Sequence, residues 1–191
     1  IGQLDESSPN MKFIGYSIRN RRKIFTYFPT ITNFGEHRSS NPKISPDGKY
    51  MLYVARNGTS GHYGKVELYN IDNVTGLLTQ VLLFDTGTMN MGAEFSANSE
   101  YLYMSNTLWD QLLVKYGIKI SQYDLKKVND VTQFQNSAYS MVVDTLDNFY
   151  GNLLLANNGK IYFIQPYGSL PSPQSFLGVI NYPYLLGAAC N

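Results

Sequence analysis

Few residues of this chain have the type and spacing that catalysis requires. A hydrolase of the Ser-His-Asp kind needs a serine on a tight, glycine-flanked turn with a histidine as its base. The nearest turn, Gly58–Gly61, contains Ser60 but lacks that spacing, and His37 and His62 are the two histidines of the chain. Neither histidine belongs to a His-x-x-x-His pair of the kind that binds zinc. We therefore predict no catalytic residue and expect both histidines to lie at the surface or in turns.

Metal binding has one candidate segment in the sequence. Calcium prefers clustered carboxylate and amide oxygens, and the best candidate is Asp144–Asn148 (DTLDN). The same composition is typical of a polar loop between strands, which is the preferred interpretation. The single cysteine, Cys190, excludes a disulfide within the chain and a cysteine-based metal cluster. The sequence thus predicts neither a metal nor a cofactor.

Three aromatic residues are candidates for ligand binding because each follows a predicted strand. Trp109, Tyr63 and Tyr167 lie in such post-strand loops. An exposed aromatic ring can stack on a sugar or anchor a protein interface at little entropic cost. The alternative is that these rings pack between elements of the fold, and both interpretations stay open at this stage.

One dense basic cluster is a further candidate binding site. It consists of Arg19, Arg21, Arg22 and Lys23 and lies between two predicted strands. Such a cluster can hold an anionic polysaccharide, a phosphate-rich surface or an acidic partner. A solvated hairpin tip explains the same residues equally well.

Composition excludes several classes of protein. The 15 Lys and Arg nearly balance the 14 Asp and Glu, and 43% of the residues are hydrophobic. This balance disfavours a disordered chain and a nucleic-acid-binding surface. No stretch approaches the roughly 18 to 20 apolar residues of a membrane span, so we expect no direct membrane insertion. The chain begins at Ile1 without an initiator methionine, which suggests processing or truncation.

The elements that must position these residues are short strands joined by tight turns. Three segments can be superimposed, each with an apolar run, a turn and a strand that alternates tyrosine with aliphatic residues: residues 43–54, 94–104 and 154–164. The turn residues Pro46, Asp47 and Gly48 suit a hairpin, because proline presets φ and glycine accepts a positive φ. Residues at the matching turn position, Asp47, Asn98 and Asn158, recur at intervals of 51 and 60 residues.

A second motif recurs nearly in step with the first. The alternating runs 66–71 and 120–125 are offset by 54 residues, and a further strand follows at 78–84. Each unit therefore holds about four strands, as a β-propeller blade does. A β-sandwich would give regular hairpins but not two motifs with nearly one offset. The predicted fold is all-β, a partial or small propeller with about four antiparallel strands in each blade.

The predicted blades divide the chain into consecutive units. A partial blade spans residues 1–35, two blades span 36–88 and 89–144, and a blade incomplete at its C-terminal end spans 145–191. Open sheet edges invite pairing. We therefore expect the partner to be another protein or the remaining part of the same polypeptide.

The order of the motifs resembles a known family. The resemblance rests on the following segments: residues 43–49, 92–105, 120–125, 155–163 and 176–191. Together they resemble the propeller-like domain of secreted, cell-surface proteins of gliding bacteria that are exported by type IX secretion. The resemblance implies a secreted or cell-surface protein with an adhesin-like role. It supplies no catalytic residue.

These observations predict a non-enzymatic, secreted or cell-surface propeller module, a scaffold for binding another protein or a glycan in adhesion or gliding. The alternative is a fragment of a secreted hydrolase whose catalytic residues lie outside this chain. Glu36, Glu94 or His37 clustered in a deep pocket would favour the enzyme. Aromatic residues on a rim would favour the binding module.

Overall fold

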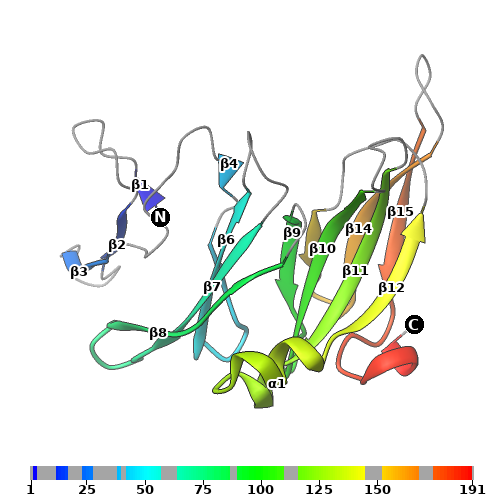
Figure 1. Cartoon of the computed structure of the whole chain (residues 1–191). Coiled ribbons are helices and arrows are strands. Elements are labelled where there is room, and N and C mark those ends of the chain that lie inside the picture. The colour runs from blue at the N-terminus through cyan, green and yellow to red at the C-terminus, as the bar shows by residue number, and fades with distance from the viewer. Residues whose placement is uncertain are drawn as a thin grey trace.

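The computed structural model describes most of the chain as short antiparallel strands. The described residues are 2–3, 12–16, 23–27, 38–39, 42–56, 64–86, 90–109, 116–144, 152–167 and 174–190. They form four sheets, which we number blades 1 to 4 in chain order (Figure 1). Among these residues, no helix has the length and apolar character needed to cross a membrane.

Each blade is a sheet of antiparallel strands that pair in chain order, except that β4 and β5 both pair with β6. Blade 1 consists of β1 (Gly2–Gln3), β2 (Lys12–Tyr16) and β3 (Lys23–Tyr27). Blade 2 consists of β4 (Arg38–Ser39), β5 (Lys43–Ile44), β6 (Tyr50–Arg56), β7 (Lys65–Ile71) and β8 (Leu78–Asp85). Blade 3 consists of β9 (Asn90–Phe95), β10 (Tyr101–Trp109), β11 (Tyr116–Asp124) and β12 (Tyr139–Asp144). Blade 4 consists of β13 (Leu153–Leu155), β14 (Ile161–Tyr167) and β15 (Gln174–Ile180).

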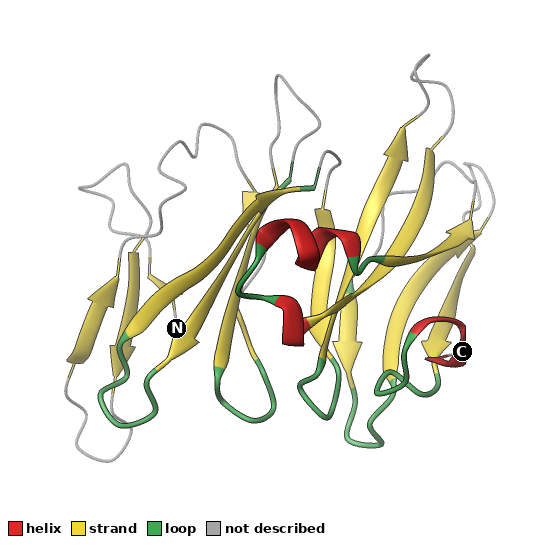
Figure 2. Ribbon diagram, turned by 60° about the horizontal axis from the view of Figure 1, so that its bottom comes forward, coloured by secondary structure: helices red, strands yellow, loops and turns green. Residues whose placement is uncertain are grey.

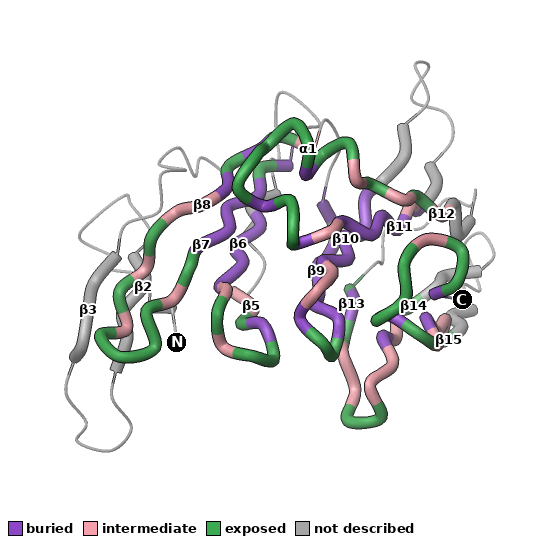
Figure 3. The backbone as a smooth tube through the Cα atoms, turned by 90° about the horizontal axis from the view of Figure 1, so that it is seen from below, coloured by how far each residue is buried: buried purple, intermediate pink, exposed green. Residues whose placement is uncertain are grey.

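The blades stand side by side in an arc. Viewed from below, β5, β9 and β13 lie on the inner side of the arc, whereas β8, α1 (Val131–Asn136) and β12 lie on the outer side (Figure 3). Strands that follow one another within each blade therefore run from the inside outward. This arrangement is that of a β-propeller, and the predicted all-β partial propeller is confirmed. The predicted blade boundaries stay a prediction.

Side-chain hydrogen bonds shape the hairpin turn at the inner edge of blades 2 and 3. Ser45 Oγ donates to Asp47 Oδ1 at 2.7 Å, and Tyr50 N donates to Ser45 Oγ at 2.9 Å. Ser96 repeats both contacts in blade 3, with Asn98 Oδ1 and Tyr101 N at the same distances. The turns project from one side of the molecule (Figure 2). This local chemistry explains why the turn motif was visible in the sequence.

The corresponding hairpin of blade 4 is one residue shorter. Ala156 N donates to Lys160 O, whereas in blade 3 Ser96 N donates to the carbonyl of Tyr101, one residue further along. The strand after the turn is therefore displaced by one position, so that Ile161 takes the place of Leu102. Since side chains alternate between the two faces of a strand, this displacement decides which face each residue of β14 occupies.

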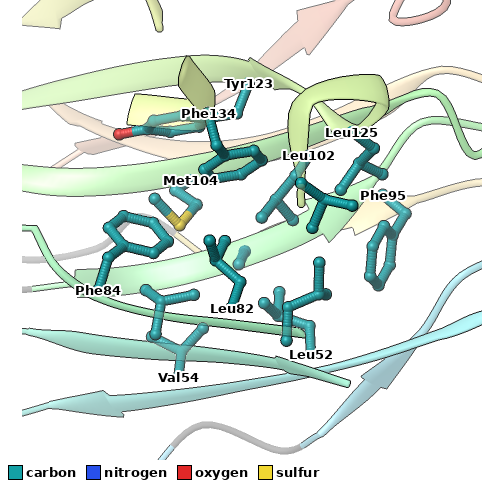
Figure 4. Close-up of a cluster of buried hydrophobic side chains, with 14 residues drawn as sticks. Leu52, Val54, Leu82, Phe84, Phe95, Leu102, Met104, Tyr123, Leu125 and Phe134 are labelled. Carbon is teal, nitrogen blue, oxygen red and sulfur yellow. The ribbon is translucent and has the colours of Figure 1, made fainter. Parts of the chain in front are cut away.

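The core lies between the blades rather than inside any one of them. Fourteen buried residues fill the space between blades 2 and 3, among them Leu52, Val54, Leu102 and Met104 (Figure 4). A second buried cluster, which includes Tyr103, Ile120 and Ile161, joins blades 3 and 4. Face-to-face packing of neighbouring sheets is what requires so many tyrosines and aliphatic residues in a chain with few charges.

A short helical insertion covers the outer edge of the first cluster. It joins β11 to β12 and contains η1 (Leu125–Lys127) and α1. Phe134 of α1 is fully buried, with its ring centroid 5.1 Å from that of Tyr123 and 5.5 Å from that of Phe84. Asp130 caps α1 by accepting the N–H of Gln133 at 3.0 Å. The sequence analysis did not predict this helical insertion.

Candidate functional site

The predicted aromatic residues belong to equivalent connections of three consecutive blades. Trp109 is the last residue of β10 and pairs with Tyr116, and Tyr167 is the last residue of β14 and pairs with Gln174. Tyr63 lies outside the described residues, in the connection between β6 and β7. Because β6, β10 and β14 are the corresponding strands of their blades, their C-terminal ends lie on one side of the molecule (Figure 1). We call this side the hairpin-end face.

A buried polar cluster lies close to the hairpin-end face in blades 2 and 3. Asn90 Oδ1 accepts hydrogen bonds from Asn106 Nδ2 and, at 3.1 Å, from Thr86 Oγ1. Thr86 N and Oγ1 also donate to the carbonyl of Gly64, at 2.9 and 3.0 Å. Asn106 precedes Trp109, the last residue of β10, by three residues, and Gly64 lies between Tyr63 and the start of β7. This cluster therefore anchors the end of β10 and the start of β7.

One amide group of this cluster has an unused donor. Asn90 Nδ2 is buried and has no hydrogen-bond partner among the residues that the structure describes. A buried unpaired donor costs stability, so such a group in a native protein calls for an explanation, such as a bound water or ion. The sequence analysis missed Asn90 and Asn106 because isolated asparagines carry no recognisable motif.

A charged junction connects the inner strands of three blades. Glu94 on β9 is 6% exposed, and its Oε2 accepts from Lys43 Nζ at 2.9 Å and from Leu155 N at 3.1 Å. Its Oε1 accepts from the N–H of Phe95 at 3.1 Å. Because Lys43 belongs to β5 and Leu155 to β13, this one carboxylate links blades 2, 3 and 4. Both of its oxygens are engaged in holding the blades together.

The other residues considered for catalysis or metal binding are only partly within the described chain. Glu36, His37 and His62 lie outside it, and of the segment Asp144–Asn148 only Asp144, the last residue of β12, is described. Within the described ranges, no group of three or more His, Cys, Asp or Glu side chains is placed to hold a metal ion. Of the residues considered for catalysis, the structure describes Glu94, which pairs with Lys43. This pairing was not predicted.

The predicted basic cluster lies at the connection between β2 and β3. Lys23 is the first residue of β3 and pairs with Tyr16. Arg19, Arg21 and Arg22 lie outside the described residues. Their role in binding stays a prediction.

The C-terminal segment 182–190, which includes η2 (Gly187–Cys190), binds the face of blade 3 that is turned toward blade 4. Gln122 Nε2 donates to Leu185 O and to the Tyr103 hydroxyl, both at 2.6 Å, and Gly187 N donates to Gln122 Oε1 at 2.8 Å. The Tyr103 hydroxyl donates to Pro183 O at 3.0 Å. Burial, and then the neighbouring Cys190, raise the pKa of Tyr103 well above its ordinary value, which keeps this hydroxyl protonated as a donor.

A difference between the two repeats marks this contact in the sequence. Gln122 occupies on β11 the position that Leu68 occupies on β7, and both side chains are fully buried. A buried amide in place of a leucine requires hydrogen-bond partners. The C-terminal segment supplies them.

Comparison with known proteins gives structural but not sequence relatives. No family model and no curated protein sequence matches the chain. The periplasmic gluconolactonase of Pseudomonas aeruginosa superposes with a TM-score of 0.55 at 12% identity, over 95% of this chain and 49% of its own. Hydrazine synthase of Kuenenia stuttgartiensis gives 0.54 at 10% identity, over 81% and 46%.

A third neighbour is the β-propeller domain of the Trilobed protease from Pyrococcus furiosus. It gives a TM-score of 0.48 at 12% identity, over 93% of this chain and 48% of its own. The chain thus spans about half the length of these structures. At such identities the likeness shows the fold alone, and the predicted link to type IX secretion and gliding stays a prediction.

The prediction that the chain is not an enzyme is wrong as it was made. Its structural neighbours include a protein named as a gluconolactonase, so enzymes occur among proteins with a similar fold. The physical reason for the error is that a propeller fold serves as a scaffold. Its chemistry depends on the few residues in the connections between its strands. The absence of a familiar catalytic motif in the sequence was therefore insufficient to exclude catalysis.

Proposed function

We propose that this chain is part of a β-propeller that binds a carbohydrate-type ligand, a sugar or a sugar-derived acid or lactone, at the hairpin-end face. The observation that carries the proposal is the recurrence of Tyr63, Trp109 and Tyr167 at the same connection of blades 2, 3 and 4. Aromatic residues in equivalent connections of neighbouring blades can form a stacking platform for sugar rings.

The buried polar cluster supports the same proposal. Asn90, Asn106 and Thr86 hold the strand ends near Trp109 and Tyr63 in place by hydrogen bonds. Asn90 Nδ2 adds an uncommitted donor at this end of blade 3. A binding site on rigid strand ends loses little entropy when its ligand binds. The name of the gluconolactonase neighbour, which refers to a sugar-derived lactone, agrees with this ligand class.

The test combines a glycan array with calorimetry on glucono-lactone, gluconate and the glycans that the array retains. Trp109→Ala should weaken binding about fivefold to tenfold, because a stacked ring contributes about 1 kcal/mol beyond its burial. Tyr184→Ala is the matched control, since Tyr184 is an exposed aromatic residue of the C-terminal segment. Retention of no carbohydrate by the wild type, or equal binding by Trp109→Ala, would overturn the proposal.

Hydrolysis of a bound lactone is a second candidate, favoured by the gluconolactonase neighbour. Glu94 is a poor candidate for the base, since both of its oxygens already accept hydrogen bonds from Lys43, Leu155 and Phe95. A pH-stat assay of glucono-lactone opening tests this candidate directly. A rate no higher than the uncatalysed rate in buffer would exclude hydrolysis and leave binding as the proposed function.

The resemblance to secreted proteins of gliding bacteria supports a location outside the cell, at the cell surface or in the medium. A carbohydrate-binding propeller in that location would serve in adhesion. Fractionation of cells that produce the protein tests the location, and recovery of the chain only with the cytoplasmic fraction would contradict it.

A further inference from the structure

The interface between blades 2 and 3 ends in polar residues at the hairpin-end face. Asn90 is the first residue of the inner strand β9 and pairs with Asn106 of β10. Its Oδ1 accepts from Asn106 Nδ2 and from Thr86 Oγ1, and Thr86 N donates to the carbonyl of Gly64 in blade 2. The cluster therefore spans the junction of the two blades, three residues before Trp109.

The amide of Asn90 offers a donor to this junction. Both printed hydrogen bonds of the side chain end on Oδ1, and Nδ2 projects from the same planar carbon in a different direction. Asn90 is 3% exposed, and Nδ2 has no hydrogen-bond partner within the described chain. A buried donor forms stronger hydrogen bonds than an exposed one, because the local dielectric constant is low. An ionised carboxylate is the acceptor that gains most from such a donor.

Two arginine positions lie at the same end of blade 2. Arg38 of β4 is directly paired with Arg56, the last residue of β6. Arg56 follows Val54 by two residues in a strand that pairs regularly with β7, so both arginine positions belong to the face that carries Val54. Val54 is buried against blade 3 (Figure 4). Like charges at directly paired positions destabilise a sheet, and a bound anion would remove that cost.

The arginine positions and Asn90 face each other across the junction. Asn106, the partner of Asn90, follows Met104 by two residues on β10, and Met104 is buried against blade 2. Gly64, the blade-2 member of the polar cluster, lies opposite Arg56 when the β6–β7 register is continued by one residue. One end of a single interface thus combines a buried donor with two positive charges.

We propose that this junction binds the carboxylate of a sugar acid, with Asn90 Nδ2 donating to one carboxylate oxygen and the arginine pair neutralising the charge. The inference rests on the proposed function and narrows its ligand from carbohydrates in general to sugar acids. A guanidinium group binds a carboxylate through two parallel hydrogen bonds. The connections that contain Tyr63 and Trp109 begin on the two sides of the junction. The sugar ring would stack there, while the carboxylate selects the ligand.

Calorimetric titration with glucuronate, gluconate and glucose tests the inference. The wild type should bind both acids roughly tenfold more tightly than glucose, which has no carboxylate. Asn90→Asp should weaken binding of the acids roughly tenfold, because it keeps Oδ1 for Asn106 and Thr86 but replaces the donor with a like charge. Arg56→Gln, which changes no side chain of the hydrogen-bonded cluster, should act in the same direction.

Lys65→Gln is the matched control for the loss of a positive charge. Lys65 is an exposed cation at the same end of blade 2, but it pairs with Ala55 and therefore lies on the opposite face of the sheet from Arg56. Its removal should change binding of the acids by less than about twofold, because exposed charges contribute little. An effect equal to that of Arg56→Gln would show that net charge, and not the junction, attracts the acids.

The outcomes separate this inference from the proposed function. Equal binding of the acids and glucose, still weakened by Trp109→Ala, would exclude the anion site and leave the carbohydrate site in place. Acetate that binds as tightly as glucuronate would exclude a sugar acid as the ligand. Binding of neither acid would overturn the inference alone if the glycan array retains a neutral glycan, and both proposals if it retains none. Circular dichroism shows whether Asn90→Asp has folded, and if it has not, Arg56→Gln decides.

Discussion

At the scale of single residues, the Glu94 carboxylate holds three blades together. It is buried at the inner side of the arc and joins strands of three different blades through Lys43 and Leu155. Breaking a buried ion pair leaves the partner's charge without compensation, which costs more than breaking a pair at the surface. The junction therefore contributes to the relative placement of the blades and not only to one sheet.

Glu94→Gln should lower the free energy of unfolding by about 1 to 3 kcal/mol, because one buried charge-assisted hydrogen bond is lost and Lys43 is left without its partner. Urea unfolding followed by circular dichroism measures the change. Glu100→Gln is the matched control, since Glu100 pairs with Lys126 at 2.8 Å in an exposed position. Equal destabilisation by the two substitutions would contradict a special role for Glu94.

At the scale of elements, the helical insertion after β11 protects the apolar cluster between blades 2 and 3. Its helix α1 has six residues, which is too short to be stable by itself in water. Its stability depends on its N-cap, Asp130, and on the packing of Phe134 against Tyr123 and Phe84. Loss of the cap should therefore expose the outer edge of the core.

The cap predicts a pH dependence at the acid end. The hydrogen bond from the N–H of Gln133 is the main cause that lowers the pKa of Asp130 from its ordinary value of 3.8. Since the pKa is lower in the folded state, the stabilisation is complete above 3.8 and is lost as the pH falls through the lowered value. The melting temperature of the wild type should thus fall more steeply below this pH than that of Asp130→Ala.

Thermal melts followed by near-ultraviolet circular dichroism, between pH 5 and the acid end, measure this difference. Gln133→Ala is the control, because it keeps the backbone N–H that Asp130 accepts and removes only the side-chain contact with Asp130 Oδ2 at 3.1 Å. This control should keep most of the pH dependence of the wild type, because the side-chain contact lowers the pKa of Asp130 less than the backbone N–H does. Parallel curves for the wild type and Asp130→Ala would show that the cap is not the titrating group.

At the scale of the whole molecule, the C-terminal segment links the end of the chain to blade 3. The segment follows β15 of blade 4, yet its hydrogen bonds go to Gln122 and Tyr103 of blade 3. The segment therefore connects blade 4 to blade 3.

Gln122→Leu should release this segment while leaving the sheets intact. The substitution copies the residue of blade 2, Leu68, but leaves Leu185 O, Gly187 N and the Tyr103 hydroxyl with fewer partners. Hydrogen exchange of the amides in residues 182–190 should accelerate on the order of tenfold, since one or two hydrogen bonds of about 1 kcal/mol each are lost. Mass spectrometry of exchanged peptides measures this effect.

Ser121→Ala is the control for this experiment, because Ser121 neighbours Gln122 on β11 but contacts Ser140 at 3.0 Å. It should leave exchange in the C-terminal segment unchanged. Unchanged exchange in Gln122→Leu as well would mean that apolar packing, and not Gln122, holds the segment.

The sequence by itself determined the strands, their tight turns and the blade repeat. These features depend on local chemistry, such as the Ser45 and Asp47 hydrogen bonds that close a turn and the alternation of side chains along a strand. The aromatic residues at strand ends were recognisable for the same reason. Local patterns of this kind survive in any single sequence.

Only the tertiary structure decided which residues meet across blades. Glu94 is 51 residues from Lys43 and 61 from Leu155, and Gln122 is 63 residues from Leu185. The shorter hairpin of blade 4 decided which side chains of β14 face outward, through a displacement of a single position. Such pairings depend on how whole sheets stack, because burial and partners are set by residues distant in the chain. No periodicity within one strand can reveal them.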